Sequence, residues 1–193
     1  MIRLALLRHG HTAWNRAGRI QGRTDIPLEP EAAAALSALR LPAPWADAAL
    51  WASPLDRAVE TARLVGQRAP RVSDSLLEMN WGAWEGEQAA ALFEKGTGYR
   101  HIEDWGWHYL PPDGESPAAV RDRVLPWLDS LAEDSVAVCH IGVMRVILAR
   151  ATGWDFAGPA PFQIKRNRLY VIEVSPGQLR LLPDQPRLEP VAP

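Results

Sequence analysis

The sequence has little cysteine, little excess charge and no long apolar run. Cys139 is the only cysteine among 193 residues, so no internal disulfide can form, and we expect a cytoplasmic location. No apolar stretch approaches the ~18 residues that cross a bilayer. Arg3 and Arg8 interrupt the apolar N-terminus, which predicts no signal peptide. The formal net charge of -2 argues against a nucleic-acid partner, and we expect no membrane partner either.

The composition is that of an ordinary globular domain, with 47% hydrophobic and 23% charged residues. Apolar runs that suit buried strands alternate with amphipathic segments that suit helices. The expected strands are residues 2–7, 48–52 and 135–139, and a hairpin is expected over 169–174 and 178–182. The expected helices are residues 30–41, 54–67, 117–131 and a segment that begins at 141, and Ser53 is expected to cap the second of them. The chain therefore reads as one α/β domain over residues 1–193, with a Pro-rich tail over 183–193 that is extended or frayed.

Basic side chains follow each of the three expected strands. Arg8 and His9 come at the end of the first strand, and His140 follows the third. Arg57 lies in the first turn of the helix after the second strand, where a cation is better placed to hold an anion than to stabilise the helix. Ligands bind at this edge of open α/β sheets, and arginine suits phosphate or carboxylate. The pattern predicts an anion pocket, whereas the alternative is a solvated basic turn and an Arg57 paired with neighbouring carboxylates.

The chemistry of this pocket points away from metals. The sequence has no Walker A motif, and the two histidines lack the carboxylate grouping of a dinuclear metal site. A phosphate pocket with a histidine nucleophile fits best, and we expect no metal and no cofactor. Glu78 lies between apolar neighbours, where burial would raise its pKa and suit a proton donor. The residues alone favour a salt-bridged structural role for Glu78, and they do not distinguish it from Glu85 or Glu87.

Residues 87–112 are expected to form a cap insertion with two short helices, separated by Gly96 and Gly98. Aromatic side chains crowd the end of this segment. They suit either the apolar face of a cap or a wall that stacks on a ring-containing leaving group. The first alternative is favoured, because most aromatic side chains are buried in packing contacts. These side chains are Trp105, Trp107, His108 and Tyr109.

Five linked motifs lie in order over residues 2–150. They are Arg8-His9-Gly10-His11-Thr12 with Trp14-Asn15, residues 18–22, residues 53–58 with Thr61-Ala62, Leu77-Glu78 with Gly82 and residues 84–86, and residues 139–142 with Arg145. Together they resemble the histidine phosphatase superfamily, in the branch of phosphoglycerate mutases and related phosphatases. The resemblance implies a three-layer α/β/α sandwich with a mostly parallel central sheet and a small helical cap insertion.

The resemblance also implies roles for single residues. His9 is implied as the nucleophile that becomes phosphohistidine. Glu78 is implied as the group that protonates the leaving alcohol and then deprotonates the attacking water. The residues implied to contact the phosphoryl oxygens are Arg8, Arg57, His140, Asn15, Gln21 and Gly22.

Two positions depart from the family's usual pattern. His11 stands where Glu or Gln is usual, at the expected mouth of the pocket. Ile141 follows the second histidine, where glycine is usual. A β-branched residue resists positive φ, so a backbone that needed such a conformation would change the local phosphate contacts.

These observations predict a metal-independent phosphomonoesterase that acts on small phosphorylated metabolites, either similar to α-ribazole phosphatases or of broad specificity. The sequence shows no obvious room for the extra segments that guard a mutase site from water. A phosphoglycerate-type phosphomutase is the first alternative, and a non-catalytic phosphate-binding scaffold is the second. The expected partner is a small-molecule phosphate ester, and both a monomer and a homodimer remain open.

Overall fold

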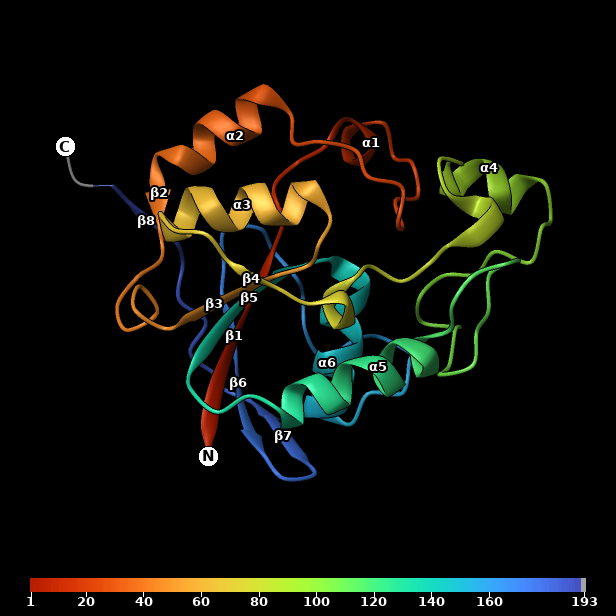
Figure 1. The fold of residues 1–193 in the computed structure, drawn as a ribbon. Helices are drawn as coiled ribbons and strands as arrows, with labels where there is room; N and C mark the ends of the chain where they lie inside the picture. Colours follow the sequence, from red (N-terminus) through yellow and green to blue (C-terminus); the bar gives the residue numbers. More distant parts are fainter. Residues whose placement is uncertain (192–193) are drawn as a thin grey trace.

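The computed structural model describes residues 1–191, and its centre is a six-stranded sheet in the order β4-β3-β5-β1-β6-β7 (Figure 1). Strands β1, β3, β4 and β5 are parallel, and β6 and β7 complete the sheet as an antiparallel hairpin. The mostly parallel sheet that the motifs implied is therefore confirmed. The strands are β1 (Ile2–Arg8), β3 (Ala49–Ala52), β4 (Arg71–Val72), β5 (Ser135–Cys139), β6 (Tyr170–Ser175) and β7 (Gln178–Leu181).

Helices cover both faces of the sheet, as Figure 1 shows. Helices α2 (Pro30–Ser37) and α3 (Asp56–Gly66) lie on one face, and α5 (Pro117–Asp129) and α6 (Ile141–Thr152) lie on the other. Alternate residues of β1 belong to different cores: Leu4 and Leu6 pack with α6, whereas Ala5 and Leu7 pack with α2 and α3. A central parallel strand that is buried on both faces needs a continuous apolar run, which explains residues 2–7.

The bounds of helices α2, α3 and α5 differ from the sequence prediction, and α5 ends at Asp129 rather than at residue 131. Helix α3 begins at Asp56 rather than Pro54, because the Ser53 hydroxyl bonds the His140 ring instead of capping the helix. Helix α2 ends at Ser37, and the next residues form β2 (Leu39–Arg40), which pairs with β8 (Glu189–Pro190). The tail was expected to be extended or frayed. The pairing of β8 with β2 and the burial of Leu188 fix its described part against the rest of the protein. Residues 192–193 of that tail lie outside the described residues.

The segment 87–112 contains one helix, α4 (Ala89–Glu94), where two were expected. Gly96 and Gly98 adopt positive φ after it, and the chain then runs in turns. Aromatic packing takes the place of the second helix: the Trp105 and Tyr109 rings stack with centroids 5.3 Å apart, and both side chains are buried. In Figure 1 this segment lies beside the sheet rather than over it. Its status as a cap insertion stays a prediction.

Short elements connect these layers. Helix α1 (Ala13–Arg16) follows β1, and the 3-10 turns η1 (Asp74–Leu76) and η2 (Gly82–Trp84) flank the loop that carries Glu78. Among the described residues, no helix is both long enough and apolar enough to span a membrane.

Candidate active site

The two predicted histidines meet at the carboxyl ends of adjacent strands. His9 follows β1 and His140 follows β5, and the register of these strands pairs Arg8 with Cys139. The His9 amide extends this ladder by donating to the Cys139 carbonyl at 3.0 Å. The two imidazole centroids lie 5.1 Å apart, and both rings are buried. Parallel pairing thus joins residues that are 131 positions apart in the sequence.

The His9 ring is held as a neutral base. Its Nδ1 lies 2.7 Å from the Gly10 carbonyl, which only accepts, so Nδ1 carries the proton and Nε2 keeps a free lone pair. Burial, followed by the charges of Arg57 and Arg8, lowers the pKa of His9 well below its usual value. An uncharged imidazole with a free Nε2 has the form that a nucleophile needs.

The His140 ring is fixed by Ser53, whose Oγ lies 2.7 Å from Nε2. Burial, followed by the proximity of His9 and Arg57, lowers the pKa of His140 well below its usual value. Its Nδ1 is buried and has no hydrogen-bond partner within residues 1–191. If the Ser53 hydroxyl donates to Nε2, the proton lies on Nδ1, which is then a free donor. Sequence reasoning missed this role because Ser-Pro at a helix start signals a cap.

Arg57 is fully buried and anchored to the loop that follows α1. Its guanidinium donates to the Gly22 carbonyl at 2.6 Å, to the Thr24 carbonyl at 3.0 Å and to the Asp25 carboxylate at 3.1 Å. The alternative of a solvated arginine paired along its own helix is therefore wrong. The third guanidinium nitrogen, Nε, is buried without a partner among the described residues.

Glu85 organises this loop in turn. Its carboxylate accepts from the backbone amides of Arg23 and Thr24 at 2.8 Å each, and from the Trp81 amide at 3.2 Å. Burial alone would raise the pKa of Glu85, but the Thr24 hydroxyl and these amides outweigh it and lower the pKa. A Cβ at Gly22 would lie 2.0 Å from the Glu85 carboxylate. Gly22 therefore permits this close approach, and it does not line the cavity beside His9.

We expect Glu85→Gln to act on Arg57 through the loop. The neutral amide keeps one acceptor oxygen, so either the Arg23 and Trp81 amides or the Thr24 amide and hydroxyl lose their acceptor, and hydrogen bonds to charged groups contribute about 1.5–3 kcal/mol each. The free energy of unfolding, measured in urea, should fall by about that amount, and kcat/KM should fall with it. Glu87→Gln is the matched control, since Glu87 is exposed and forms only a surface pair with Lys95 at 3.8 Å. If both substitutions lowered stability and kcat/KM equally, the idea that Glu85 supports Arg57 through the loop would be contradicted.

Glu78 lines the same cavity as His9, and 3% of its surface is exposed. Its carboxyl group accepts from the Met79 amide at 2.7 Å and from the Gly142 amide, at the start of α6, at 3.1 Å. Burial raises the pKa of Glu78, opposed by these two amides and then by Arg57. Within the described residues Glu78 forms no ion pair, so the salt-bridged structural interpretation fails. A Cβ at Gly142 would lie 2.3 Å from this carboxyl group, which explains the glycine.

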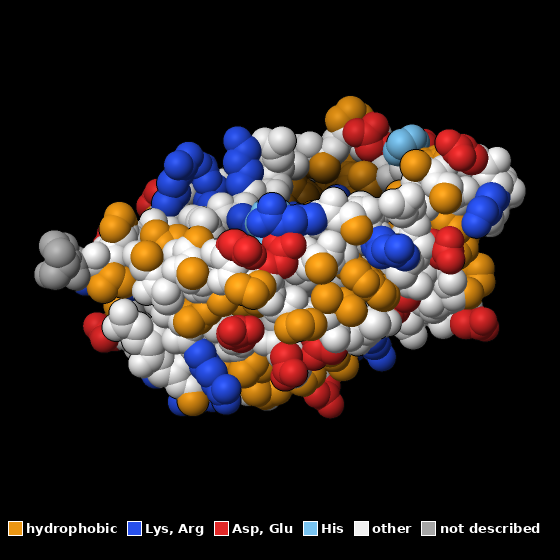
Figure 2. All heavy atoms as spheres, turned by 90° about the horizontal axis from the view of Figure 1, so that it is seen from above, with side chains coloured by type: hydrophobic (Ala, Val, Ile, Leu, Met, Phe, Trp, Pro, Cys, Tyr) orange, Lys and Arg blue, Asp and Glu red, His pale blue; other side chains and the backbone are white. Residues whose placement is uncertain are grey.

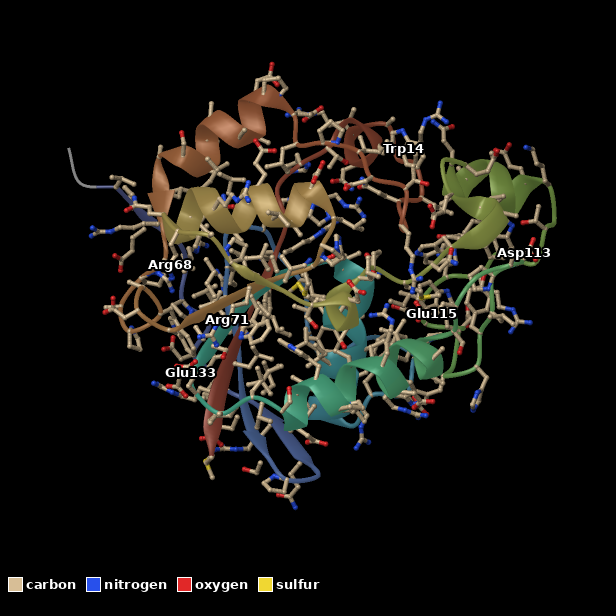
Figure 3. All side chains as sticks on the ribbon, in the orientation of Figure 1. Trp14, Arg68, Arg71, Asp113, Glu115 and Glu133 are labelled. Carbon is tan, nitrogen blue, oxygen red and sulfur yellow. The ribbon has the colours of Figure 1, made fainter. Side chains whose placement is uncertain are left out.

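The loop that carries Glu78 is fixed from outside the cavity. Arg123 on α5 donates to the Ser75 and Leu77 carbonyls at 2.6 and 2.7 Å. Arg123 forms an ion pair at 2.8 Å with Glu115. Glu115 lies just before α5, as Figure 3 shows. The position of Glu78 therefore depends on two charged side chains that no motif marked.

The cavity of about 160 Å³ beside His9 also brings together predicted polar residues. The Asn15 amide donates to the Gln21 carbonyl oxygen at 3.2 Å, and both side chains line the cavity. Arg166, from the loop before β6, donates to Asn15 at 2.9 Å and to the His9 carbonyl at 3.3 Å. Sequence reasoning missed Arg166 because it lies outside every motif. Figure 2 shows a hollow between the body of the molecule and the lobe with α4, with largely hydrophobic walls.

Buried donors without partners gather around His9. Six buried side-chain nitrogens lack a hydrogen-bond partner among residues 1–191, and two of them are the indole nitrogens of Trp51 and Trp127. Such atoms are rare because leaving a donor unpaired costs free energy. The other four all belong to predicted site residues, of which Arg8 and Gln21 also line the cavity beside His9. They are Arg8 Nε, Gln21 Nε2, Arg57 Nε and His140 Nδ1.

The two departures from the family pattern have different outcomes. Ile141 is the first residue of α6, and it is not among the described non-glycine residues with positive φ. The strain considered for this position therefore does not arise, and the side chain lines the cavity instead. His11 is exposed.

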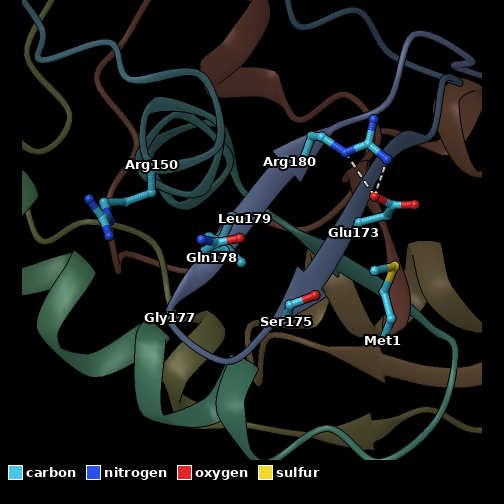
Figure 4. Close-up of a pocket in the computed structure, with 8 residues that line it drawn as sticks. All are labelled: Met1, Arg150, Glu173, Ser175, Gly177, Gln178, Leu179 and Arg180. Atoms are coloured by element: carbon cyan, nitrogen blue, oxygen red, sulfur yellow. Dashed lines mark hydrogen bonds and ion pairs between the residues drawn. The ribbon is translucent and has the colours of Figure 1, made fainter.

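Size alone does not select this site. A hollow of about 470 Å³ lies beside the β6–β7 hairpin and Met1, at the opposite end of β1 (Figure 4). Two of its charged side chains pair with each other, since Arg180 bonds Glu173, and the third, Arg150, is exposed. In the portion of the chain that is described, no group of three or more His, Cys, Asp or Glu side chains is arranged to hold a metal ion.

Comparisons with known proteins agree with this geometry. Residues 4–183 match the model of the histidine phosphatase superfamily, branch 1. A 2,3-bisphosphoglycerate-dependent phosphoglycerate mutase of Nitratidesulfovibrio vulgaris is 31% identical over 98% of this chain and 94% of its own. An adenosylcobalamin/alpha-ribazole phosphatase of Salmonella typhimurium is 31% identical over 91% of this chain and 92% of its own.

The fold agrees as well. The crystal structure of a phosphoglycerate mutase from Thermus thermophilus superposes with a TM-score of 0.67, at 34% identity, over 97% of this chain and 99% of that one. The mutase and phosphatase relatives both match nearly the whole chain, so they leave the specific substrate open. The chain belongs to the histidine phosphatase superfamily and is an enzyme of phosphoric monoester chemistry.

Proposed function

We propose that this protein hydrolyses small phosphomonoesters without a metal ion, through a phosphohistidine at His9. The observation that carries the proposal is the group of four unpartnered buried donors around a neutral histidine with a free Nε2. Phosphoryl transfer needs little beyond positioning and stabilisation of charge on three oxygens. This site supplies donors for those oxygens and a nucleophile in the correct protonation state.

In the first step, His9 Nε2 attacks phosphorus and the ester P–O bond breaks. Arg8, Arg57 and His140 donate to the phosphoryl oxygens. The leaving oxygen takes its proton from Glu78, whose raised pKa keeps the acid form available. An alcohol departs, and the phosphoryl group remains on His9.

In the second step, a water molecule attacks phosphorus and the P–N bond breaks. Glu78, now a carboxylate, takes the proton from this water, and inorganic phosphate leaves. The Met79 and Gly142 amides hold the carboxyl group in place through both steps. One residue thus serves as acid and then as base, as in other two-step hydrolyses.

The pH dependence follows from the two shifted groups. The first step needs unprotonated His9 and protonated Glu78. Burial lowers the pKa of His9 from 6.5, so the rate rises with pH at values below that. Burial raises the pKa of Glu78 from 4.5, so the rate falls with pH only above that. We expect a bell-shaped kcat/KM for ethyl phosphate, after correction for the ester's own ionisation. A rising limb at or above pH 6.5 would contradict the neutral His9.

The proposal is tested by phosphate release from a panel of phosphomonoesters in buffer with a chelator. Wild type should release phosphate from at least one ester, and His9→Ala should release none above background. The preferred ester would also decide between an α-ribazole-like and a broad-specificity phosphatase. A cytoplasmic location stays a prediction.

A phosphoglycerate-type mutase is the second candidate, because the phosphoglycerate mutase relative matches 98% of this chain. A mutase keeps its phosphohistidine until a second acceptor binds. It would transfer phosphate between hydroxyl groups of a phosphoglycerate, dependent on a bisphosphate primer, and release little phosphate. Failure of both assays in a folded protein would leave the phosphate-binding scaffold.

A further inference from the structure

A second cavity, of about 180 Å³, adjoins the site at His9. Two residues of helix α6, Ile141 and Arg145, line both cavities, so the two spaces share a wall. The cavity at His9 is rich in charged and polar groups, whereas the second one is mainly apolar. The other residues that line the second cavity are Ile102, Trp154, Ala160, Phe162, Gln163 and Ile164.

Hydrogen bonds and a ring contact within the protein fix the walls of the second cavity before any ligand binds. The Tyr170 hydroxyl accepts from the Lys165 amide and donates to the Gln163 carbonyl, both at 2.6 Å. The Trp154 indole donates to the Gly158 carbonyl at 3.1 Å, and its ring meets Phe162 edge-on with centroids 5.6 Å apart. This rigid framework suits a small-molecule site, because such sites are usually largely formed before binding.

Two further contacts tie the wall to the segment that contains Ile102. The Gly106 amide donates to the Phe156 carbonyl at 3.1 Å, and the Gly158 amide donates to the Glu103 carbonyl at 2.9 Å. The loop before β6 and the segment 87–112 therefore form one continuous wall.

Arg145 occupies the boundary between the two cavities. Within residues 1–191, its guanidinium has no hydrogen-bond acceptor and no carboxylate partner, and burial lowers its pKa to about 10, so it stays charged at neutral pH. It also lies over no aromatic ring of the described chain. A planar guanidinium stacks well on an aromatic face, and here that face would have to come from a ligand.

We propose that the second cavity receives the leaving group of the phosphomonoester bound at His9, and that this leaving group carries an apolar ring. This inference rests on the proposed phosphatase function. The size agrees, because a 150 Å³ apolar cavity holds benzene. The ring would contact Trp154, Phe162 and Ile164 and would stack on Arg145.

The sequence offered a different ring-binding wall, formed by the aromatic side chains near Tyr109. Trp105 and Tyr109 stack on each other, and Trp105 also stacks on Phe156 with centroids 6.1 Å apart. Both rings also line a separate hollow of about 470 Å³, which shares no lining residue with the cavity at His9. The ring-binding wall is instead formed by the loop before β6, which no motif marked.

The test compares 2-phenylethyl phosphate with ethyl phosphate, two alkyl esters that differ by one ring. Wild type should prefer the phenyl ester in kcat/KM by at least about tenfold, a discrimination that apolar pockets commonly reach. Ala160→Leu fills the cavity and should abolish most of this preference. Ala157→Leu is the matched control, since Ala157 is exposed on the same loop and lines neither cavity, and it should keep the preference.

If Ala160→Leu does not fold, as judged by circular dichroism, Ile164→Ala removes part of the wall and should lower the same preference. The inference is overturned if wild type hydrolyses both esters equally well, or if the folded cavity variant keeps the wild-type preference. The proposed function fails differently: wild type releases no phosphate from either ester, or His9→Ala releases as much as wild type does.

Discussion

Glu78→Gln is expected to lower kcat/KM for ethyl phosphate by about 10²–10⁴-fold, the usual contribution of a general acid. The amide cannot protonate the departing alkoxide, although its oxygen keeps one of the two backbone hydrogen bonds that hold the side chain. The p-nitrophenolate ion needs little protonation to leave. The same substitution should therefore leave the initial burst of p-nitrophenol from p-nitrophenyl phosphate nearly unchanged.

The burst is the informative quantity because Glu78 also activates water in the second step, so the steady rate falls for every substrate. Rapid-mixing absorbance gives the burst for the aryl ester, and single-turnover phosphate release gives the alkyl rate. Glu87→Gln, exposed on the surface, should behave as wild type on both esters. Equal losses of the first-step rate on the two esters would contradict proton donation by Glu78.

Arg57→Ala is expected to lower kcat/KM by about 10²–10³-fold, the cost of removing one preorganised donor from a transition state. Unlike Glu78→Gln, it should affect aryl and alkyl esters equally, because the phosphoryl oxygens are common to both. Arg57→Lys should recover little, since an ammonium cannot hold both the loop carbonyls and a phosphoryl oxygen through one planar fork.

Arg63→Ala is the matched control for Arg57→Ala. Arg63 lies on the same helix α3 but is exposed, so its loss should leave kcat/KM within a factor of about two. Thermal unfolding of both variants separates loss of activity from loss of fold. A folded Arg57→Ala protein with wild-type kcat/KM would show that Arg57 serves only to anchor the loop after α1.

Local patterns predicted the sheet and the convergence of the two histidines. A buried parallel strand needs a continuous apolar run, which residues 2–7 and 135–139 supply. The polar residue that follows such a strand then lies at the carboxyl edge of the sheet. Arg8, His9 and His140 followed from this geometry alone, and Arg57 followed from the unfavourable position of a cation at a helix start.

The remaining features depend on contacts between distant parts of the chain. Ser53 carries a helix-cap signal, yet its hydroxyl serves His140, which is 87 positions away. Nothing in the local sequence selects Glu78 over Glu85, and only the fold packs Glu78 against α6 and bonds Glu85 to the loop that anchors Arg57. The second helix expected in the segment 87–112 is absent because its aromatic side chains pack with a loop near residue 156.

Both proposed steps require that His9 carries the phosphoryl group. The most direct measurement is rapid acid-free quenching of wild type during turnover of p-nitrophenyl phosphate, followed by proteolysis and mass spectrometry. We expect phosphate on the peptide that contains His9, formed and lost at rates that match turnover, and no such peptide in His9→Ala. Turnover without a phosphoenzyme, or phosphate on another residue, would contradict it.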